Sequence, residues 1–218
     1  FALVVILTEK SQSKLRKLDM KILGIGNAIV DVICKVEDDF ITKNELTKST
    51  MKLIFDESEF KKLLSNLKIE KTVSGGSVAN SIVGLSQLGN EVGFIGKVND
   101  DELGSKYEDG LKQENVKYFY SKKKEDLPTG TCLILVTPDS ERTMCTFLGT
   151  AGRINENDVN SDAIKQSEII LLEGYLWDEG EPKKAFEKAI LSANKVAMSL
   201  SDQFCVDRHK PHFLELVK

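Results

Sequence analysis

The sequence predicts an α/β fold in which a mostly parallel sheet carries a smaller β-sheet lid. From residue 91 onward, strand-like and helix-periodic segments alternate, which is typical of βαβ units and a parallel sheet. Two segments, about 31–55 and 117–148, show strand patterns only and are expected to form the lid. No internal repeat or low-complexity linker divides residues 20–218, so we expect them to fold as one domain.

Before residue 90, hydrophobic spacing separates strands from helices. Strands are expected where β-branched residues dominate, and helices where apolar residues recur at helical spacing, as Phe60, Leu63 and Leu67 do. Asp56 is a start signal for the first helix, and Gly89 is a stop signal for the second. These patterns predict a strand, a bend and a second strand within 21–36, a strand at 50–55, and helices at 56–67 and 77–89.

The same criteria define the alternating part of the chain. Acidic residues open the helix at 100–115, where the helix dipole favours them, and Pro182 lies near the first turn of a later helix. A turn from Pro138 to Glu141 joins two strands into a hairpin. The elements expected here are strands at 91–98, 131–137, 142–148, 167–176 and 195–202, and helices at 100–115, 181–194 and from 207.

Composition argues for a soluble globular protein and against two classes of partner. Hydrophobic residues make up 41% of the chain and charged residues 29%, which is ordinary for such proteins. The net charge of -4 gives no basic surplus for nucleic acid, and no apolar run is long enough to span a membrane. The cysteines lack the spacing of a zinc module, so reduced thiols and a cytoplasmic location are expected. Cys132 and Cys145 lie on the two arms of the hairpin and could face each other, which does not by itself make a disulfide.

The N-terminal stretch is expected to stand outside the domain. It begins "FALVVIL", without Met, and lacks the basic start and the cleavage site of a signal peptide. Met20 opens the first strand that fits the fold. We therefore expect residues 1–19 to be an extension.

The stretch "SGGSVANS" (74–81) places two glycines before a helix. It lacks the lysine of a P-loop, and "GIGNAI" (24–29) has only two of the three glycines of a dinucleotide fingerprint. Gly75 and Gly76 would let a ligand approach the backbone at a helix N-terminus, with Asn80 about one turn further on. A tight turn with a surface Asn remains the alternative at this point.

A carboxylate at the mouth of the sheet supports the ligand interpretation. Asp31 belongs to "GNAIVD" (26–31) and follows a strand at the edge where α/β folds bind ligands. A carboxylate accepts hydrogen bonds from two neighbouring hydroxyls, as a sugar diol offers, and Asn27 can donate and accept beside it.

Five motifs in this order resemble the ribokinase or PfkB family of carbohydrate and nucleoside kinases, with the adenosine-kinase-like branch the most similar. They are "GNAIVD", "GGSVANS", "GFIGKVNDDELG" (93–104), "TGTCLILVTPDSERTM" (129–144) and "EGYLWD" (173–178). The resemblance covers about 20–218 and implies a ribokinase-like, Rossmann-like sheet with helices on both faces and a β lid over the sugar. It also implies transfer of the ATP γ-phosphate, with Mg²⁺, to a hydroxyl of adenosine as first choice, then ribose or a fructose-type sugar. Lid strands pair between subunits in this family, which leaves a homodimer open.

The resemblance assigns roles to residues of this chain. Asp31 would bind sugar hydroxyls with help from Asn27, and Gly75, Gly76 and Asn80 would line the sugar pocket. Arg142 matches an arginine of the lid hairpin that approaches the transferring phosphate, where a fixed positive charge helps. A solvent-facing hairpin arginine is the equally weighted alternative.

Two departures from the family pattern are visible. Asn99 stands where the family usually has Gly, a mild change if positive φ is required there. No Gly-Ala-Gly-Asp-type catalytic loop occurs in the sequence, and the Asn-x-x-Glu magnesium motif is missing from the place that it has in the family; both normally follow the position of Lys218. The chain is thus expected to be the N-terminal two-thirds of a kinase and inactive alone. A non-catalytic nucleoside- or sugar-binding module is the main alternative, and a nicotinamide enzyme is disfavoured.

The remaining polar and aromatic candidates are weaker. Asp202 follows a strand on the side where nucleotide phosphates and magnesium would sit, and a cap or turn role is favoured over a cofactor role. His209 and His212 lack the further ligands of a metal set, so no metal ligand is assigned, and exposed positions are expected for both. Tyr175 and Trp177 could stack a base, although core packing is the favoured interpretation.

Overall fold

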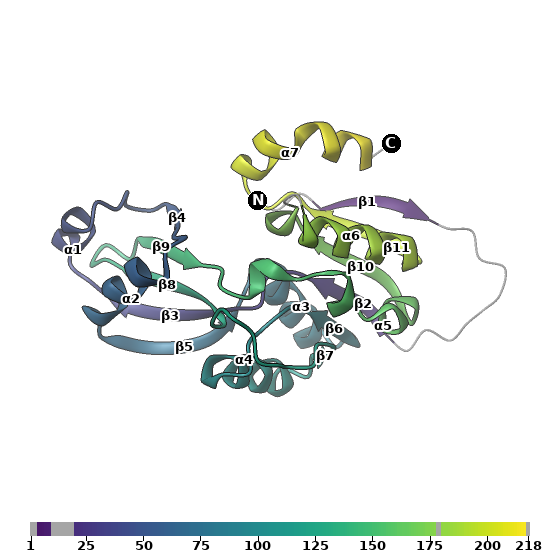
Figure 1. Cartoon of the computed structure of the whole chain (residues 1–218), viewed down its shortest axis with the longest axis horizontal. Coiled ribbons are helices and arrows are strands. Elements are labelled where there is room, and N and C mark those ends of the chain that lie inside the picture. Colours follow the sequence, from purple (N-terminus) through teal and green to yellow (C-terminus); the bar gives the residue numbers. More distant parts are fainter. Residues whose placement is uncertain (1–3, 10–19, 178–179, 217–218) are drawn as a thin grey trace.

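The computed structural model describes residues 4–9, 20–177 and 180–216, which form two sheets placed end to end (Figure 1). The larger sheet has the strand order β1-β11-β10-β2-β6-β7. All neighbours from β11 to β7 pair in parallel, whereas β1 runs antiparallel to β11. Its strands are β1 (Val4–Glu9), β2 (Met20–Ile25), β6 (Val92–Ile95), β7 (Lys117–Tyr118), β10 (Ser167–Glu173) and β11 (Lys195–Ser199).

Alternating apolar residues give this sheet two buried faces, as the sequence predicts. In β10, Ile169 and Leu171 belong to one hydrophobic cluster, and Ile170 and Leu172 belong to another. The first cluster includes α3 (Ser77–Gln87) and α4 (Glu102–Gln113). The second includes α5 (Ser161–Lys165), α6 (Glu181–Ser192) and α7 (Gln203–Leu216). Helices on both faces are therefore confirmed.

The smaller sheet is the predicted lid and has the order β4-β9-β8-β3-β5. Its strands are β3 (Ile29–Lys35), β4 (Met51–Leu53), β5 (Ile69–Gly75), β8 (Gly130–Val136) and β9 (Arg142–Phe147), with α1 (Asp38–Lys43) and α2 (Glu57–Ser65) beside them. The antiparallel β8–β9 hairpin is present as predicted. Figure 1 shows the lid with α1 and α2 at one end of the molecule and α5 and α6 at the other.

Several sequence-based boundaries of the lid are corrected by the structure. β5 is a lid strand that the polar sequence at 68–73 did not reveal, and among the described strands it pairs with β3 alone. Residues 117–118 form β7 of the larger sheet, because they pair with β6. The segment 31–55 is not all β, since α1 lies inside it.

Predictions for the two ends of the chain also need correction. The expectation that residues 1–19 stand outside the fold fails for β1, which pairs antiparallel with β11; residues 1–3 and 10–19 lie outside the described residues. The backbone of β1 completes the sheet edge that β11 would otherwise leave open. The last helix, α7, begins at Gln203 rather than at 207.

Strand register separates the two hairpin cysteines. Cys132 is paired with Thr146, and Cys145 with Leu133, so the two thiols project from opposite faces of the lid sheet. All four cysteines are buried, and none of them forms a disulfide. They do not face each other, contrary to the arrangement considered from the sequence.

The parallel strands end at one common edge, next to the lid. Asn27 follows β2, Glu173 ends β10, and Asp202 lies beyond β11. Because β3 continues directly from β2 into the lid, Asp31 enters the same region from the other sheet. This edge is where open α/β sheets bind ligands. No helix of the described segments is both long and apolar enough to cross a membrane.

Candidate substrate site

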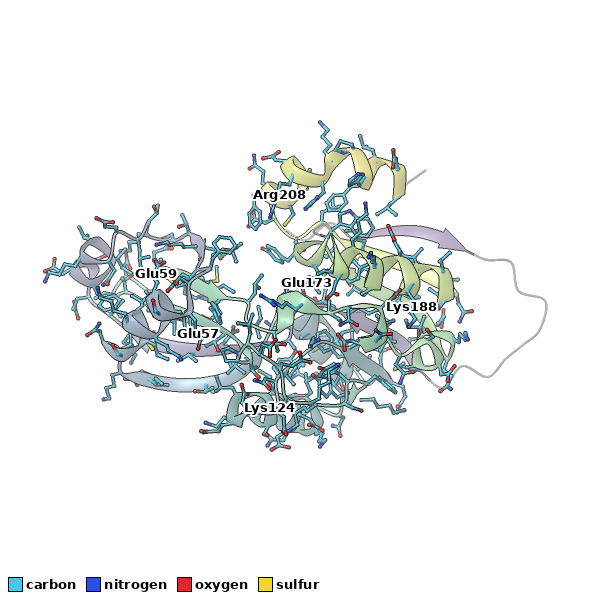
Figure 2. The ribbon with its side chains drawn as sticks, in the orientation of Figure 1. Glu57, Glu59, Lys124, Glu173, Lys188 and Arg208 are labelled. Carbon is cyan, nitrogen blue, oxygen red and sulfur yellow. The ribbon has the colours of Figure 1, made fainter. Side chains whose placement is uncertain are left out.

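A cavity of about 260 Å³ lies between the lid and the carboxyl edge of the parallel sheet. Five of the seven site residues predicted from the sequence line it, although they are spread over most of the chain. They are Asn27, Asp31, Gly76, Asn80 and Asp202. Figure 2 shows Glu173, another lining residue, between the lid and the larger sheet, and Arg208 on α7 above it.

The two glycines at the start of α3 leave room for neighbouring polar groups. A Cβ atom on Gly75 would overlap the Asp31 carboxylate, and one on Gly76 would overlap the Asn27 carbonyl oxygen. Gly76 also has φ +103°, a conformation that L side chains rarely adopt. The glycine pair therefore brings the N-terminus of α3 against Asn27 and Asp31.

Replacing Gly76 with alanine is expected to destabilise the protein. The positive φ and the overlap with Asn27 together should lower the free energy of unfolding by about 2 kcal/mol or more. Thermal denaturation should then show a melting temperature lower by about 4–8 °C. The matched control is Gly84→Ala within α3, where an added Cβ meets nothing within 4 Å. It should be neutral or stabilising by about 0.5–1 kcal/mol, and an equal loss in both variants would contradict the argument.

Glu173 organises this side of the cavity. Its side chain is 1% exposed and accepts hydrogen bonds from the Asn27 backbone N–H (3.3 Å), Asn27 Nδ2 (2.8 Å) and the Val78 backbone N–H (3.0 Å). Val78 N–H is one of the free donors of the first turn of α3. Burial raises the pKa of the Glu173 carboxyl, and these hydrogen bonds oppose the rise. Glu173 thus joins β2, β10 and α3.

The orientation of Asn27 leaves one polar atom without a partner. Nδ2 is held by Glu173, so Oδ1 is directed elsewhere, and Oδ1 is buried with no hydrogen-bond partner among the described residues. A buried acceptor without a partner costs about 1–3 kcal/mol, and Asn27 lines the cavity. A hydroxyl donor from a ligand would satisfy it.

Asp31 provides a second acceptor on the lid side of the cavity. Burial raises the pKa of its carboxyl to about 6, because the charged form is poorly solvated there. No described residue donates a side-chain or backbone hydrogen bond to this carboxylate in the structure. Asn27 and Asp31 thus both line the cavity, and both carry oxygen atoms that can accept hydrogen bonds.

The rest of the lid face is mainly apolar, with Thr146 as its polar residue. Alternate residues of β3, β8 and β9, with two from β4, project into the cavity. Thr146 Oγ1 lies 3.2 Å from Cys132 Sγ, and burial raises the pKa of the Cys132 thiol to about 12, so this thiol is neutral. The apolar and sulfur-containing lining consists of Ile29, Met51, Leu53, Cys132, Ile134, Met144 and Leu148.

Comparison with known families covers nearly the whole described domain. Residues 24–217 match the family described as pfkB family carbohydrate kinase. The chain belongs to the pfkB family.

Curated relatives of this pfkB chain include two enzymes named 5-dehydro-2-deoxygluconokinase. The 5-dehydro-2-deoxygluconokinase of Mesomycoplasma hyopneumoniae is 27% identical over 161 residues, which are 73% of this chain and 46% of that protein. The enzyme of the same name from Clostridium perfringens is 31% identical over 144 residues, or 65% of this chain and 43% of that protein. The chain thus spans about half the length of the curated relatives it matches.

Solved structures similar to the chain are longer as well. An adenosine kinase from Sinorhizobium meliloti has 37% sequence identity and a TM-score of 0.83, and the match covers 90% of this chain and 61% of that one. A probable sugar kinase protein from Rhizobium etli CFN 42 has 35% identity and a TM-score of 0.81, with the same coverages. These matches agree with the ribokinase-like fold expected from the sequence.

Two of the predicted site residues of the pfkB chain do not line the cavity. Gly75 packs against the Asp31 carboxylate and is not among the residues that line the cavity. Arg142 is the first residue of β9 and is exposed. It shares a sheet face with Met144 and Thr146 but lies nearer the turn, beyond the lining residues. Its approach to a phosphate stays a prediction.

Asp202 lies at the α7 side of the cavity, within an aromatic group. Tyr175 Oη donates to Asp202 Oδ2 at 3.5 Å, and the rings of Tyr175 and Phe204 have centroids 5.7 Å apart. Tyr175 is therefore a cavity residue, whereas Trp177 packs against Phe186 in the core. The described residues include no group of three or more His, Cys, Asp or Glu side chains placed to hold a metal. These residues do not by themselves provide a site that fits Mg²⁺.

Two further sequence-based expectations are corrected. His209 is buried and packs against Phe213 with ring centroids 5.9 Å apart, because α7 turns this face toward the core. Asn99 is not among the residues with positive φ. Its side chain instead bonds the backbone of Glu125 and Leu127, which explains a residue with an amide at this position.

Sequence reasoning missed Glu173 and Arg208 as cavity residues. Glu173 was visible as the first residue of "EGYLWD", directly after an apolar strand, and a carboxylate at such a strand end is a usable signal. Arg208 had no comparable signal, because only the packing of α7 brings it to the cavity.

Asn80 also borders a second groove of about 620 Å³ between β5 and α4.

Proposed function

We propose that the protein to which this chain belongs is an ATP-dependent kinase that phosphorylates a hydroxyl group of a nucleoside, with adenosine as first choice. In this proposal, residues 20–218 supply the substrate site and the lid. The observation that carries it is that the unpartnered Asn27 amide oxygen and the Asp31 carboxylate belong to residues lining one cavity, because a pair of ribose hydroxyls would satisfy both acceptors. Membership of the pfkB family supports the phosphate-transfer chemistry.

The lining of the cavity favours a nucleoside over a free sugar. Asn27, Asp31 and Glu173 form a polar end, whereas the lid contributes mainly aliphatic and sulfur-containing side chains. A free sugar carries hydroxyls around its ring and would leave some of them against this apolar face, at a cost in desolvation. A nucleobase would bury its flat faces there, and the sulfur atoms of Met51 and Met144 make favourable contacts with aromatic rings.

One observation favours a second candidate, a sugar acid such as 5-dehydro-2-deoxygluconate. Arg208 lines the α7 side of the cavity, with its guanidinium carbon 5.3 Å from the Phe204 ring centroid. A guanidinium group is well suited to a carboxylate. The substrate named for the curated relatives carries such a group.

Isothermal titration calorimetry of the 218-residue chain distinguishes these candidates. Adenosine should bind more tightly than ribose and than 5-dehydro-2-deoxygluconate, and Asp31→Ala should weaken adenosine binding by about tenfold to a hundredfold. Asp162→Ala, an exposed carboxylate on α5, is the matched control and should leave the affinity unchanged. Tighter binding of the sugar acid, lost in Arg208→Ala, would favour the second candidate. Unchanged adenosine affinity in Asp31→Ala would remove Asp31 from the site.

Adenosine binding is expected to depend on pH through Asp31. Its pKa of about 6 leaves the carboxyl about one-tenth ionised at pH 5 and about nine-tenths ionised at pH 7. If the carboxylate accepts the sugar hydroxyls, the dissociation constant should fall about tenfold over this range. Calorimetry at several pH values measures this change.

As the pH rises, the free energy of unfolding should fall over part of that range, whereas the affinity for adenosine should rise. A carboxyl with a raised pKa holds its proton more tightly in the folded protein than in the unfolded chain, so its contribution to stability falls as pH rises from about 4 to about 6. Asp31→Asn should remove this contribution and flatten the pH dependence of binding. A binding profile that is equally steep in Asp31→Asn would assign the dependence to another group.

A further inference from the structure

Lys97 is a buried lysine that no step of substrate binding uses. It follows β6 at the carboxyl edge of the parallel sheet, and its side chain is 4% exposed. A buried ammonium group is costly unless it is paired and hydrogen-bonded. The partners of Lys97 therefore indicate the structural role of this buried charge.

The partners of Lys97 lie on the two segments that connect the lid hairpin to the larger sheet. Lys97 Nζ is 3.2 Å from Glu125 Oε1 and 3.1 Å from Asp158 Oδ2. Glu125 lies between β7 and β8, on the segment that leads into the hairpin. Asp158 lies between β9 and β10, on the segment that returns from it. We call Lys97, Glu125 and Asp158 the charge cluster.

Both carboxylates of the charge cluster have further partners that fix them in place. Asp158 has a side chain 2% exposed and accepts from the Asn155 backbone N–H at 3.0 Å. Glu125 Oε1 accepts from Tyr120 Oη at 3.2 Å. Lys123 Nζ, at the surface, lies 3.3 Å from Asp158 Oδ1 and 3.7 Å from Glu125 Oε1. Such a network holds its members in one arrangement, because each loses a partner if one moves.

Further hydrogen bonds tie the leading segment to the same part of the larger sheet. The Asn99 side chain bonds Glu125 N–H (2.9 Å) and the Leu127 carbonyl oxygen (3.0 Å). Asp101 accepts from Thr129 N–H (2.9 Å) and from the Thr129 hydroxyl (2.7 Å), one residue before β8 begins. The leading segment is thus fixed up to the first residue of the hairpin.

The cavity depends on where this hairpin lies. Cys132, Met144 and Thr146 on the hairpin form one side of the cavity, and Asn27 and Glu173 on the larger sheet form the other. We propose that Lys97 is a positioning residue that joins both connecting segments of the lid hairpin to the parallel sheet and so sets the width of the cavity. Its effect on ligand binding rests on the proposed function, whereas its effect on hairpin position does not.

Electron paramagnetic resonance between two spin labels tests the positional effect directly. The labels are attached at Glu141→Cys on the hairpin and at Leu191→Cys, an exposed position of α6. The native cysteines are buried, so the introduced thiols react first. We expect a narrow distance distribution in the parent chain, and a broader or displaced one in Lys97→Met.

Two further variants separate positioning from general destabilisation. Removing one partner of a buried ion pair leaves an uncompensated charge and endangers folding. The triple variant Lys97→Met, Glu125→Gln, Asp158→Asn leaves no uncompensated charge in the charge cluster. If Lys97→Met does not fold, the triple variant tests whether the cluster positions the hairpin. The matched control is Lys117→Met in β7, whose partner Glu91 is a surface residue, and it should keep the parent distribution. A parent-like mean and width in the triple variant would overturn the proposal.

Calorimetry with adenosine adds the functional consequence. In the triple variant the dissociation constant should rise by about tenfold or more, while Lys117→Met stays within about twofold of the parent. An unchanged adenosine affinity together with an unchanged distance distribution would exclude a positioning role. If the parent chain itself does not bind adenosine, the proposed function fails, and the distance measurement still decides the role of Lys97.

Discussion

Incubated with adenosine, ATP and magnesium, the purified 218-residue chain is expected to release no ADP above background. The substrate side of a phosphoryl-transfer site is recognisable in Asn27, Asp31 and Glu173. The sequence contains no Gly-Ala-Gly-Asp-type loop, which supplies both an anion hole and the base in the family that it resembles. A general base typically contributes about 10²–10⁴-fold and an anion-hole donor about 10²–10³-fold, so their combined loss should lower the rate by about 10⁴-fold or more.

A coupled assay for ADP measures this result, with adenosine binding to the same sample as the control for an intact site. Binding without turnover is the expected combination. Turnover of about one per second that disappears in Asp31→Ala would contradict this expectation. It would also show that the catalytic groups lie within these residues.

Replacing Glu173 with alanine should have the largest effect on stability of any single change in the cavity. The substitution leaves the Asn27 backbone N–H, Asn27 Nδ2 and the Val78 N–H without their acceptor. Each buried donor without a partner costs about 1–3 kcal/mol, and relief from burying the carboxylate offsets part of the sum. We expect a loss of about 3 kcal/mol in the free energy of unfolding and a melting temperature lower by about 6–12 °C.

The same variant should weaken adenosine binding by about tenfold or more, because Glu173 would no longer hold the side-chain amide of Asn27, a cavity residue, in one orientation. Glu168→Ala is the matched control, since Glu168 lies on the same strand and pairs with Lys21 at the surface. An exposed ion pair of this kind contributes about 0–1 kcal/mol. The losses of stability and of adenosine affinity in Glu173→Gln should lie between those of Glu168→Ala and Glu173→Ala. Equal losses in the two alanine variants would show that Glu173 does not organise the cavity.

Local sequence signals identified five residues of the cavity, because each signal follows from short-range geometry. The bend at Gly26-Asn27 leads the chain from the buried strand β2 into β3 of the lid, which carries Asp31. Gly75 and Gly76 mark the start of α3. Strand ends in a parallel sheet share one edge, so their residues converge whatever their distance along the chain. Asn27, Asp31, Gly76, Asn80 and Asp202 were therefore predictable as neighbours of one cavity.

Elements whose stability comes from partners were not predictable in this way. β5 has a polar, half-exposed pattern that resembles a loop, and its strand conformation depends on pairing with β3. β1 becomes part of the fold only by pairing with β11 at the far end of the chain. β7, two residues long, belongs to the larger sheet only because it pairs with β6.

The sequence by itself determined the α/β class, the parallel order of strand and helix, and the polar groups at the carboxyl edge, because hydrophobic periodicity and glycine positions act locally. Tertiary structure alone decided which polar groups became partners. Glu173 lies against Asn27, and Lys97 joins Glu125 to Asp158, through pairings that no spacing in the chain encodes. It also decided that Arg208 reaches the cavity and Arg142 does not. The physical reason is that burial makes these charged and polar contacts worth forming, and burial is a property of the packed molecule rather than of any segment.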